Sequence, residues 1–169
     1  MTWYLLLVAA VAVERVIELV VSSRNLAWSR ARGGVEFGAR HYPAMVALHA
    51  GVLVGCAVEP IVLHRPFVPA LGWPMFAVVL VAQGLRWWCI ATLGRQWNTR
   101  VVVIPGAERV ARGPYRFFSH PNYVAVVAEG IALPLVHSAW ITASLFSVLN
   151  AVLLRRRIKV EDAALAGLK

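Results

Sequence analysis

Arg112-Gly-Pro-Tyr-Arg-Phe-Phe-Ser-His-Pro-Asn-Tyr123 is a polar, proline-punctuated segment that leads into the last two apolar runs of the chain. Gly113-Pro114 favours a turn, because glycine tolerates a positive φ and proline fixes its own φ near about −65°. His120-Pro121 favours a helix start, since proline's missing N–H costs nothing at the first helical position. A helix N-terminus beside His120 and Arg116 suits an anionic or polar ligand. Alternatively, the two prolines only end a loop and begin a membrane helix.

The composition is typical of an integral membrane protein. Of the 169 residues, 60% are hydrophobic and 15% are charged, whereas soluble domains have about 45–50% apolar and about 25% charged residues. Cys56 and Cys89 lie in separate apolar runs and form no CxxC pair, so we interpret them as small core residues. The five histidines have no zinc-ligand spacing, and we expect no metal site.

Five apolar runs predict five membrane-spanning helices, at about residues 2–21, 43–63, 70–93, 121–136 and 139–154. Only His137-Ser138 separates the last two runs, which predicts a tight antiparallel hairpin. Residues 22–42 form a polar connection, and residues 155–165 read as an interfacial helix. The predicted fold class is all-α: a polytopic membrane helical bundle of about five transmembrane helices, with a C-terminal helical hairpin and a cytoplasmic cofactor pocket. We expect one domain, 1–169, with three N-terminal spans in 1–93 and the catalytic core in 94–169.

The predicted spans contain several charged residues. Glu14 and Glu18 are four residues apart and share a helix face, with Arg15 beside them. Such charges usually point into a bundle or a wet cavity, although near a water interface they can also extend to the surface. Arg86 precedes Trp87 and Trp88 and is either part of an interfacial anchor or a cation that faces a substrate.

The positive charges predict the orientation in the membrane. Of 17 Lys and Arg residues, fourteen lie in residues 22–42, 94–119 and 155–169, and the opposite side has only Arg65. The positive-inside rule therefore puts these three segments in the cytoplasm and the N-terminus outside. The net charge of +9 then needs no nucleic-acid partner, and no nucleic-acid-binding motif is present.

Three polar segments should converge on the cytoplasmic side: Trp97-Asn98-Thr99, Arg112–Tyr123 and Arg157–Glu161. Together they offer cations, hydroxyl and amide groups, aromatic faces and the carboxylates of Glu161-Asp162, which suits a zwitterionic cofactor below a lipid-filled cleft. The acidic pair has a second interpretation, as a solvated balance to the Arg155–Arg157 run. No glycine-rich turn of the doubly wound kind is present.

The order of these pieces resembles the isoprenylcysteine carboxyl methyltransferase family of integral-membrane, S-adenosylmethionine-dependent enzymes. The resemblance covers roughly residues 94–165: Arg112-Gly-Pro-Tyr-Arg, His120-Pro-Asn-Tyr123, a short hydrophobic hairpin, then Arg157-Ile-Lys-Val-Glu161. Family members typically read Arg-His-Pro where this chain has Ser119-His120-Pro121, and a double Glu where it has Glu161-Asp162. The first departure removes one cation near the cofactor.

Upstream motifs are similar to a bacterial branch of the family associated with type III polyketide synthases, whose members O-methylate alkylpyrones and alkylresorcinols. The motifs are Arg24-Asn, Gly34-Val-Glu-Phe-Gly38, His41-Tyr-Pro43 and Gly94-Arg-Gln-Trp-Asn-Thr-Arg100. The resemblance implies O-methylation of the ring hydroxyl of such a lipid in the bilayer, and a functional link to a type III polyketide synthase.

The resemblance also implies the site residues. It implies catalytic roles for His120, Arg157 and Glu161. The cofactor would contact His120, Pro121, Tyr123 and Glu161, and its pocket would be lined or shaped by Gly113, Pro114, Tyr115, Arg116 and Arg157. We expect Trp97, Asn98 and Arg86 to bind the acceptor.

The chemistry of the acceptor decides whether a base is needed. A hydroxypyrone is acidic enough to be an enolate near neutral pH, whereas a resorcinol hydroxyl, with a pKa near about 10, would benefit from a base such as His120. Three alternatives stay open: carboxyl methylation of an isoprenylcysteine-like substrate, a nicotinamide-dependent membrane reductase, and a non-enzymatic membrane assembly or lipid-binding protein.

Overall fold

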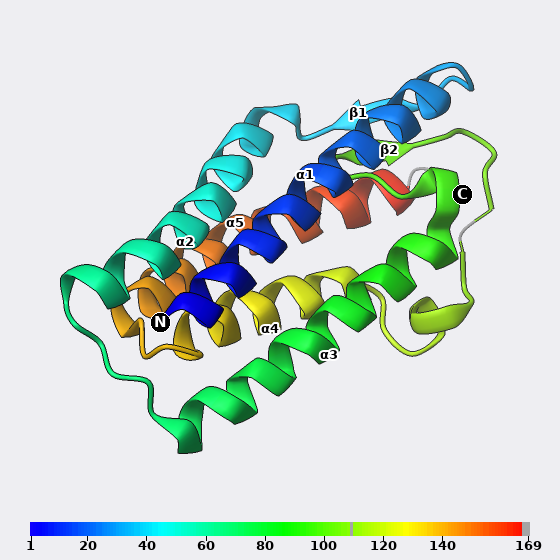
Figure 1. Ribbon diagram of the computed structural model, residues 1–169. Coiled ribbons are helices and arrows are strands. Elements are labelled where there is room, and N and C mark those ends of the chain that lie inside the picture. Colours follow the sequence, from blue (N-terminus) through cyan, green and yellow to red (C-terminus); the bar gives the residue numbers. More distant parts are fainter. Residues whose placement is uncertain (109, 167–169) are drawn as a thin grey trace.

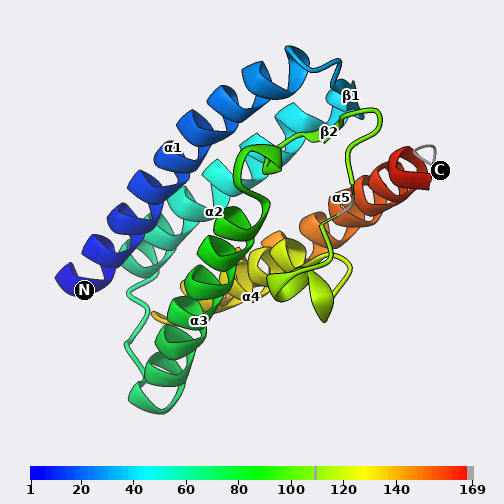
Figure 2. The same ribbon diagram turned by 90° about the vertical axis from the view of Figure 1, so that its right-hand side faces the viewer.

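The computed structural model describes residues 1–108 and 110–166, so Arg109 and Lys169, two of the charges counted above, lie outside the described residues. It is mostly helical. The helices are α1 (Thr2–Arg30), α2 (Tyr42–Val62), α3 (Pro69–Leu93), α4 (Pro121–Leu135) and α5 (Trp140–Ala166). The start of α1 lies at the opposite end of the bundle from the end of α5 (Figures 1 and 2). Two short strands, β1 (Val35–Phe37) and β2 (Val101–Val103), lie at the same end as the last turns of α5.

The structure confirms the helices predicted from the apolar runs, and it confirms the tight hairpin between the last two. α4 and α5 are separated by four residues, in which Ser138 has a φ of 56° and the Ala139 N–H donates to the Pro134 carbonyl at 3.0 Å. At Gly130 an added Cβ would lie 1.8 Å from the Phe146 ring, so the two helices approach closely there.

α1 is longer than predicted, because residues 22–30 continue the helix instead of forming a polar connection. Three polar side chains in this extension, Ser22, Asn25 and Ser29, are buried, and the first two contact a distant loop. Ser22 Oγ accepts a hydrogen bond from the Thr99 N–H at 3.0 Å, and Asn25 Nδ2 donates to the Trp97 carbonyl at 2.7 Å. These partners, about seventy residues away, stabilise a helical turn that looks like a loop in the sequence.

Residues 155–165 are helical, as predicted for the tail, but they continue the last apolar run without a break as part of α5. Residues 140–166 contain no proline or glycine, so the sequence has no helix-breaking residue where the apolar run passes into Arg155 and the polar tail. The continuous helix carries Arg157 and Glu161 on from the apolar hairpin to the polar end of the protein.

The all-α prediction requires one correction, because β1 and β2 pair antiparallel with Val35 opposite Val103 and Phe37 opposite Val101. Glu36, the middle residue of β1, accepts hydrogen bonds from Arg100 at 2.7 Å and from Arg30 at 3.1 Å. The β-branched run was visible in the sequence, but its partner strand depends on the tertiary fold. This small ribbon covers one side of the candidate site described below.

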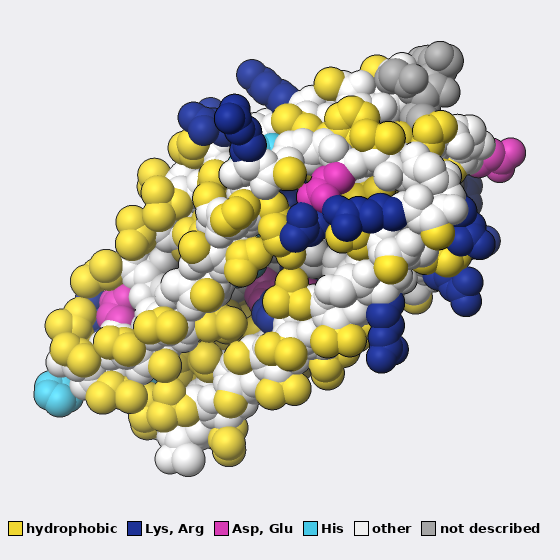
Figure 3. All heavy atoms as spheres, turned by 90° about the horizontal axis from the view of Figure 1, so that it is seen from above, with side chains coloured by type: hydrophobic (Ala, Val, Ile, Leu, Met, Phe, Trp, Pro, Cys, Tyr) yellow, Lys and Arg dark blue, Asp and Glu magenta, His cyan; other side chains and the backbone are white. Residues whose placement is uncertain are grey.

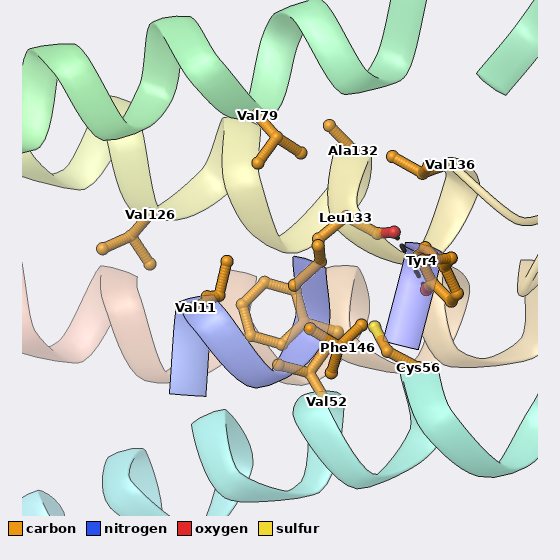
Figure 4. Packing of buried hydrophobic residues seen from close by; sticks show 11 residues of the cluster. Tyr4, Val11, Val52, Cys56, Val79, Val126, Ala132, Leu133, Val136 and Phe146 are labelled. Carbon is orange, nitrogen blue, oxygen red and sulfur yellow. Dashed lines mark hydrogen bonds between the residues drawn. The ribbon is translucent and has the colours of Figure 1, made fainter. Parts of the chain in front are cut away.

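The hydrophobic core lies toward the N-terminal end of the bundle and draws on α1 to α5 (Figure 4). Tyr4 is fully buried there, and its hydroxyl donates to the Leu133 carbonyl at 3.1 Å. Glu59 of α2 caps the start of α5, because its carboxylate accepts the N–H groups of Ile141 at 3.1 Å and Thr142 at 2.7 Å. Cys56 and Cys89 are buried and free, as predicted for small core residues.

Within the described residues, two helical segments are long and apolar enough to cross a membrane, Ala39–Val62 and Pro69–Gln96. Only 28% of each apolar window is buried inside the protein, so most of these side chains face outward. An outward-facing apolar surface of this extent fits lipid and does not fit a soluble core helix. α4 is apolar but has only 15 residues, and α1 and α5 carry charged residues.

Candidate active site

A cavity of about 170 Å³ lies at the end of the bundle that carries the two strands. We call it the polar cavity. Its walls come from the loop before β2, from β2 itself, from the start of α4 and from the end of α5. The predicted site residues that line it are Trp97, Asn98, Tyr115, His120, Tyr123, Arg157 and Glu161. The fold therefore brings together the three polar segments that the sequence analysis expected to converge.

Four side chains that line this cavity, together with Asp162 next to them, form one network, which we call the site cluster: His120, Tyr123, Arg157, Glu161 and Asp162. His120 Nδ1 lies 3.5 Å from Glu161 Oε1, and its Nε2 lies 3.1 Å from Asp162 Oδ1. The imidazole stacks on the Tyr123 ring, with centroids 5.4 Å apart. The Tyr123 hydroxyl donates to the Glu161 carboxylate and accepts from Arg157 Nε at 2.8 Å.

The contacts of His120 set its protonation state. The hydrogen bond to Glu161 raises the pKa of His120 above its ordinary value, and this effect outweighs the opposing effect of burial. Burial alone would raise the pKa of Glu161, but the hydrogen bonds from His120 and Tyr123 lower it. The pair is therefore favoured as imidazolium and carboxylate. Because both ring nitrogens face carboxylates, these contacts disfavour the role of base that the sequence suggested for His120.

Several buried polar atoms around the polar cavity have no hydrogen-bond partner among the described residues. They are Trp97 Nε1, Asn98 Nδ2 and Oδ1, and Asn122 Oδ1. Unpaired buried donors and acceptors are costly, so their presence along one cavity indicates a ligand with many hydrogen-bonding groups. Such a set, with the Glu161 carboxylate beside it, fits the amino, hydroxyl and ring nitrogen groups of S-adenosylmethionine.

A second cavity of about 310 Å³ lies between the helices, and we call it the apolar cavity. α2 contributes Met45, Val46, Ala50 and Leu53 to it, and α1 contributes Ala12, Val16 and Leu19. Figure 3 shows a mostly hydrophobic face of the protein with a recess in which acidic and basic side chains are visible. Most of the Lys and Arg side chains seen in that view lie toward the end that carries the strands.

The two cavities share part of their walls. Trp97, Asn122, Tyr123 and Arg157 line both. Arg157 is fixed at this boundary, since its Nη2 donates to the Thr99 carbonyl at 2.6 Å and its Nη1 contacts Met45 Sδ at 3.6 Å. A ligand in the polar cavity and a ligand in the apolar cavity would meet at these side chains.

The charged residues of the predicted spans point into the bundle, as the sequence analysis proposed for Glu14 and Glu18. We call Glu14, Arg15, Glu18, Arg86 and Glu129 the interhelical cluster. Glu18 is 2% exposed and accepts hydrogen bonds from Arg86 Nε at 2.6 Å and from Arg15 Nη1 at 2.7 Å. Arg15, Glu18 and Arg86 also line the apolar cavity. The sequence analysis expected Arg86 to bind the acceptor.

Four predicted cofactor residues do not line either cavity among the described residues: Gly113, Pro114, Arg116 and Pro121. Gly113 and Pro114 begin a 3-10 turn, Gly113–Arg116, that packs on α3. Gly113 has a φ of 57°, and an added Cβ would lie 2.5 Å from Thr92 Oγ1, so only glycine suits this position. These residues position Tyr115, which does line the polar cavity.

Sequence reasoning assigned no site role to two residues that line the cavities, Asn122 and Tyr42. Asn122 lies between the predicted Pro121 and Tyr123, and Tyr42 lies within the quoted motif His41-Tyr-Pro43, so the motifs were the only signal available. Tyr42 and Ser22 both hold Thr99, which lines the apolar cavity, through hydroxyl contacts of 3.1 Å and 2.8 Å. No group of three or more potential ligand side chains that could hold a metal occurs in the part of the chain that the structure describes.

Comparison with known proteins identifies the family of the chain. The model of the isoprenylcysteine carboxyl methyltransferase (ICMT) family matches residues 75–167. The uncharacterized protein YpbQ of Bacillus subtilis (strain 168) is 39% identical over 161 residues, which cover 95% of each chain. An uncharacterized protein of Haemophilus influenzae is 23% identical over 163 residues, which cover 95% of this chain and 93% of that one. No solved structure matches significantly.

An outward-facing apolar helical bundle with a polar cavity at one end fits a membrane protein with a site for a small molecule. The chain belongs to the isoprenylcysteine carboxyl methyltransferase family, and this confirms the family resemblance found in the sequence. Family membership makes it a membrane methyltransferase. Because both relatives are named only as uncharacterized proteins, they say nothing about the acceptor.

Proposed function

We propose that this protein transfers a methyl group from S-adenosylmethionine to the ring hydroxyl of a long-tailed lipid of the alkylpyrone or alkylresorcinol type. One observation supports this most directly. A polar cavity and an apolar cavity share a wall made of Trp97, Asn122, Tyr123 and Arg157. This arrangement suits a transfer from a water-soluble donor on one side to a bilayer lipid on the other.

The residues of the polar cavity would bind and orient the donor. S-adenosylmethionine, when bound, supplies an activated methyl group whose in-line transfer depends on positioning and needs little covalent help. The Glu161 carboxylate can accept hydrogen bonds from an amine or from ribose hydroxyls. The unpaired amide groups of Asn98 and Asn122 and the indole N–H of Trp97 can supply the remaining hydrogen bonds. His120 and Arg157 hold Glu161 and Tyr123 in place.

The residues of the apolar cavity would hold the lipid. Met45, Val46, Ala50 and Leu53 lie along one face of α2 and provide an apolar wall for an alkyl tail. Each CH₂ buried there should add up to about 0.8 kcal/mol of binding until the cavity is filled. Activity at low acceptor concentration should therefore rise with tail length and then level off. The ring would lie at the shared wall, next to Tyr123 and Arg157.

The acceptor is tested by incubating membranes that contain the protein with methyl-labelled S-adenosylmethionine and lipid extracts. An alkylpyrone or alkylresorcinol gives a methyl ether, which survives mild base. An isoprenylcysteine-like carboxylate gives a methyl ester instead, from which base releases labelled methanol. Base-stable label in a ring-bearing lipid supports the proposal, and base-labile label contradicts it. Co-expression with a type III polyketide synthase should increase the labelled product.

We also propose the topology that the charge pattern predicts, with five spans, the N-terminus outside and the polar cavity in the cytoplasm. Fourteen Lys and Arg residues on one side against one on the other favour this orientation. A reporter that is active only in the cytoplasm should be active when it is fused to the C-terminus. Activity of a periplasmic reporter at that position would contradict the orientation.

A further inference from the structure

His49 is a titratable residue of the apolar cavity that has no role in the site described so far. It lies in the middle of α2, lines the apolar cavity and packs edge-on against the Phe146 ring, with centroids 5.7 Å apart. In the sequence it is a single histidine in an apolar run, which is more often a helix residue satisfied by its own backbone. The structure gives it a defined orientation toward the cavity.

The backbone of α2 fixes the tautomer of His49. Its Nδ1 lies 2.8 Å from the Met45 carbonyl oxygen. A carbonyl can only accept, so Nδ1 carries the hydrogen, and in the neutral ring Nε2 is left with a free lone pair. The structure gives His49 this one side-chain hydrogen bond among the described residues. In its neutral form, His49 therefore offers a proton acceptor at Nε2 from a position on the lining of the apolar cavity.

The position of His49 also suits contact with an acceptor at the shared wall. Side chains on a helix lean toward its N-terminus, and the bond to Met45 holds the His49 ring over the preceding turn. Met45 in turn contacts Arg157, which lines both cavities. An acceptor ring at the shared wall, next to Arg157 and Tyr123, would therefore lie beside the His49 imidazole.

The two histidines that line the cavities, His120 and His49, differ in whether a ring nitrogen is available to accept a proton. Both ring nitrogens of His120 face carboxylates, so it has no free lone pair to offer. His49 has one nitrogen bound to a carbonyl and one available. The charged and titratable groups that line the cavity around His49 are Arg15 and Glu18 of α1, Tyr42 of α2, Arg86 of α3, Tyr123 of α4 and Arg157 of α5.

We propose that His49 is the general base that removes the proton from the acceptor hydroxyl, and that the acceptor is a phenol-like lipid, such as an alkylresorcinol, whose hydroxyl is protonated at neutral pH. This inference rests on the proposed function. As the acceptor oxygen forms its bond to the methyl carbon, the carbon–sulfur bond breaks and its electron pair leaves with sulfur, which becomes a neutral thioether. The hydroxyl proton goes to His49 Nε2, and the imidazolium later releases it to water.

The need for a base separates the acceptor classes. A carboxylate is ionised at neutral pH and has no proton to lose, and a hydroxypyrone is ionised or nearly so. A resorcinol hydroxyl has a pKa of about 10, so its attack gains from a base beside it. A base-competent imidazole in the acceptor cavity thus favours the resorcinol class within the proposed function.

Activity measurements test this with His49→Gln, which keeps the size of the side chain but removes the basic nitrogen. His64→Gln is the matched control, because His64 lies in an exposed loop away from both cavities. Methylation of an alkylresorcinol should fall about 10²-fold or more in His49→Gln, the usual size of a general-base contribution. Methylation of a hydroxypyrone with the same tail should stay close to wild type, as should both reactions in His64→Gln.

Loss of both reactions to the same extent, or of neither, would overturn the role of His49. A wild-type protein that methylates neither lipid would overturn the proposed function and this inference together. Titration with S-adenosylmethionine shows whether His49→Gln is folded, because the polar cavity does not include residue 49. If that variant does not fold, His49→Asn is measured in the same way.

A second measurement needs no methyl transfer. An alkylated nitrophenol is yellow only when it is ionised, and it can bind in the apolar cavity without S-adenosylmethionine. Proton transfer to His49 should give more of the yellow phenolate with the wild-type protein and with His64→Gln than with His49→Gln at the same pH. The same colour with all three proteins would overturn the proposal.

Discussion

The site cluster and the interhelical cluster both bring Arg and Glu side chains together inside the bundle, but they differ in the uncharged polar groups beside them. In the interhelical cluster the buried Glu18 is bound by both Arg15 and Arg86, while Arg15 Nε and Glu129 Oε2 are buried without hydrogen-bond partners among the described residues. In the site cluster the charges also pair with one another, and the neighbouring uncharged Trp97, Asn98 and Asn122 present four further buried polar atoms without partners. Charge inside an apolar bundle therefore does not by itself indicate a ligand site. A set of unpaired, uncharged polar groups along one cavity does.

The largest effect is expected from breaking the interhelical cluster. Arg86→Ala leaves Glu18 as a buried charge with fewer partners, and removal of one partner of a buried pair costs about 3–5 kcal/mol. The free energy of unfolding, measured in detergent with denaturant, should fall by this amount. Replacing both residues, Glu18→Leu with Arg86→Met, should recover most of the loss, because no charge is left unpaired. A double variant no more stable than Arg86→Ala would contradict this.

A smaller effect, on ligand binding, is expected from breaking the site cluster. Glu161→Ala and His120→Ala should each weaken binding of S-adenosylmethionine by about 1.5–3 kcal/mol, the size of a lost hydrogen bond to a charged group. Calorimetric titration measures this. Asp162→Ala should weaken binding less, since the Asp162 side chain is 59% exposed and contacts His120 at Nε2, the nitrogen that does not face Glu161. Wild-type affinity in folded Glu161→Ala and His120→Ala would contradict the assignment.

The site cluster should also make stability depend on pH. The pKa of His120 is raised in the folded protein, so its contribution is fully present below the ordinary value of 6.5 and is lost as the pH rises through the raised pKa. The pKa of Glu161 is lowered, so its contribution is present above 4.5 and is lost as the pH falls through the lowered pKa. The melting temperatures of wild type and His120→Asn should therefore differ most between pH 4.5 and 6.5. A constant difference at every pH would contradict the ion pair.

The smallest effect is expected at an exposed ion pair of the same chemistry. Arg30 contacts Glu36 at 3.1 Å, but the Arg30 side chain is 60% exposed. Arg30→Ala should change the free energy of unfolding by less than about 1 kcal/mol, because solvent screens such pairs. A loss as large as that of Arg86→Ala would mean that burial does not separate the two cases.

Parts of the fold and site could be predicted because their signals are local. Apolar runs placed α2, α3 and α4, and the order of the polar motifs placed His120, Tyr123, Arg157 and Glu161 in one cavity. The helical extension of α1 and the pairing of β1 with β2 could not be predicted, because both depend on distant partners. His49 could not be predicted either, since one histidine in an apolar run does not reveal what lies opposite it.

The central claim is that two separate cavities hold two substrates that meet at a shared wall, and Ala50→Trp tests it most directly. Ala50 lines the apolar cavity but not the polar one, and the neighbouring Ala47, which lines neither, gives the matched control Ala47→Trp. Titration calorimetry and lipid methylation are measured on the same preparations. Ala50→Trp should abolish lipid methylation and leave the affinity for S-adenosylmethionine unchanged, while Ala47→Trp changes neither. Loss of S-adenosylmethionine binding together with methylation in Ala50→Trp, or full methylation in that variant, would contradict the claim.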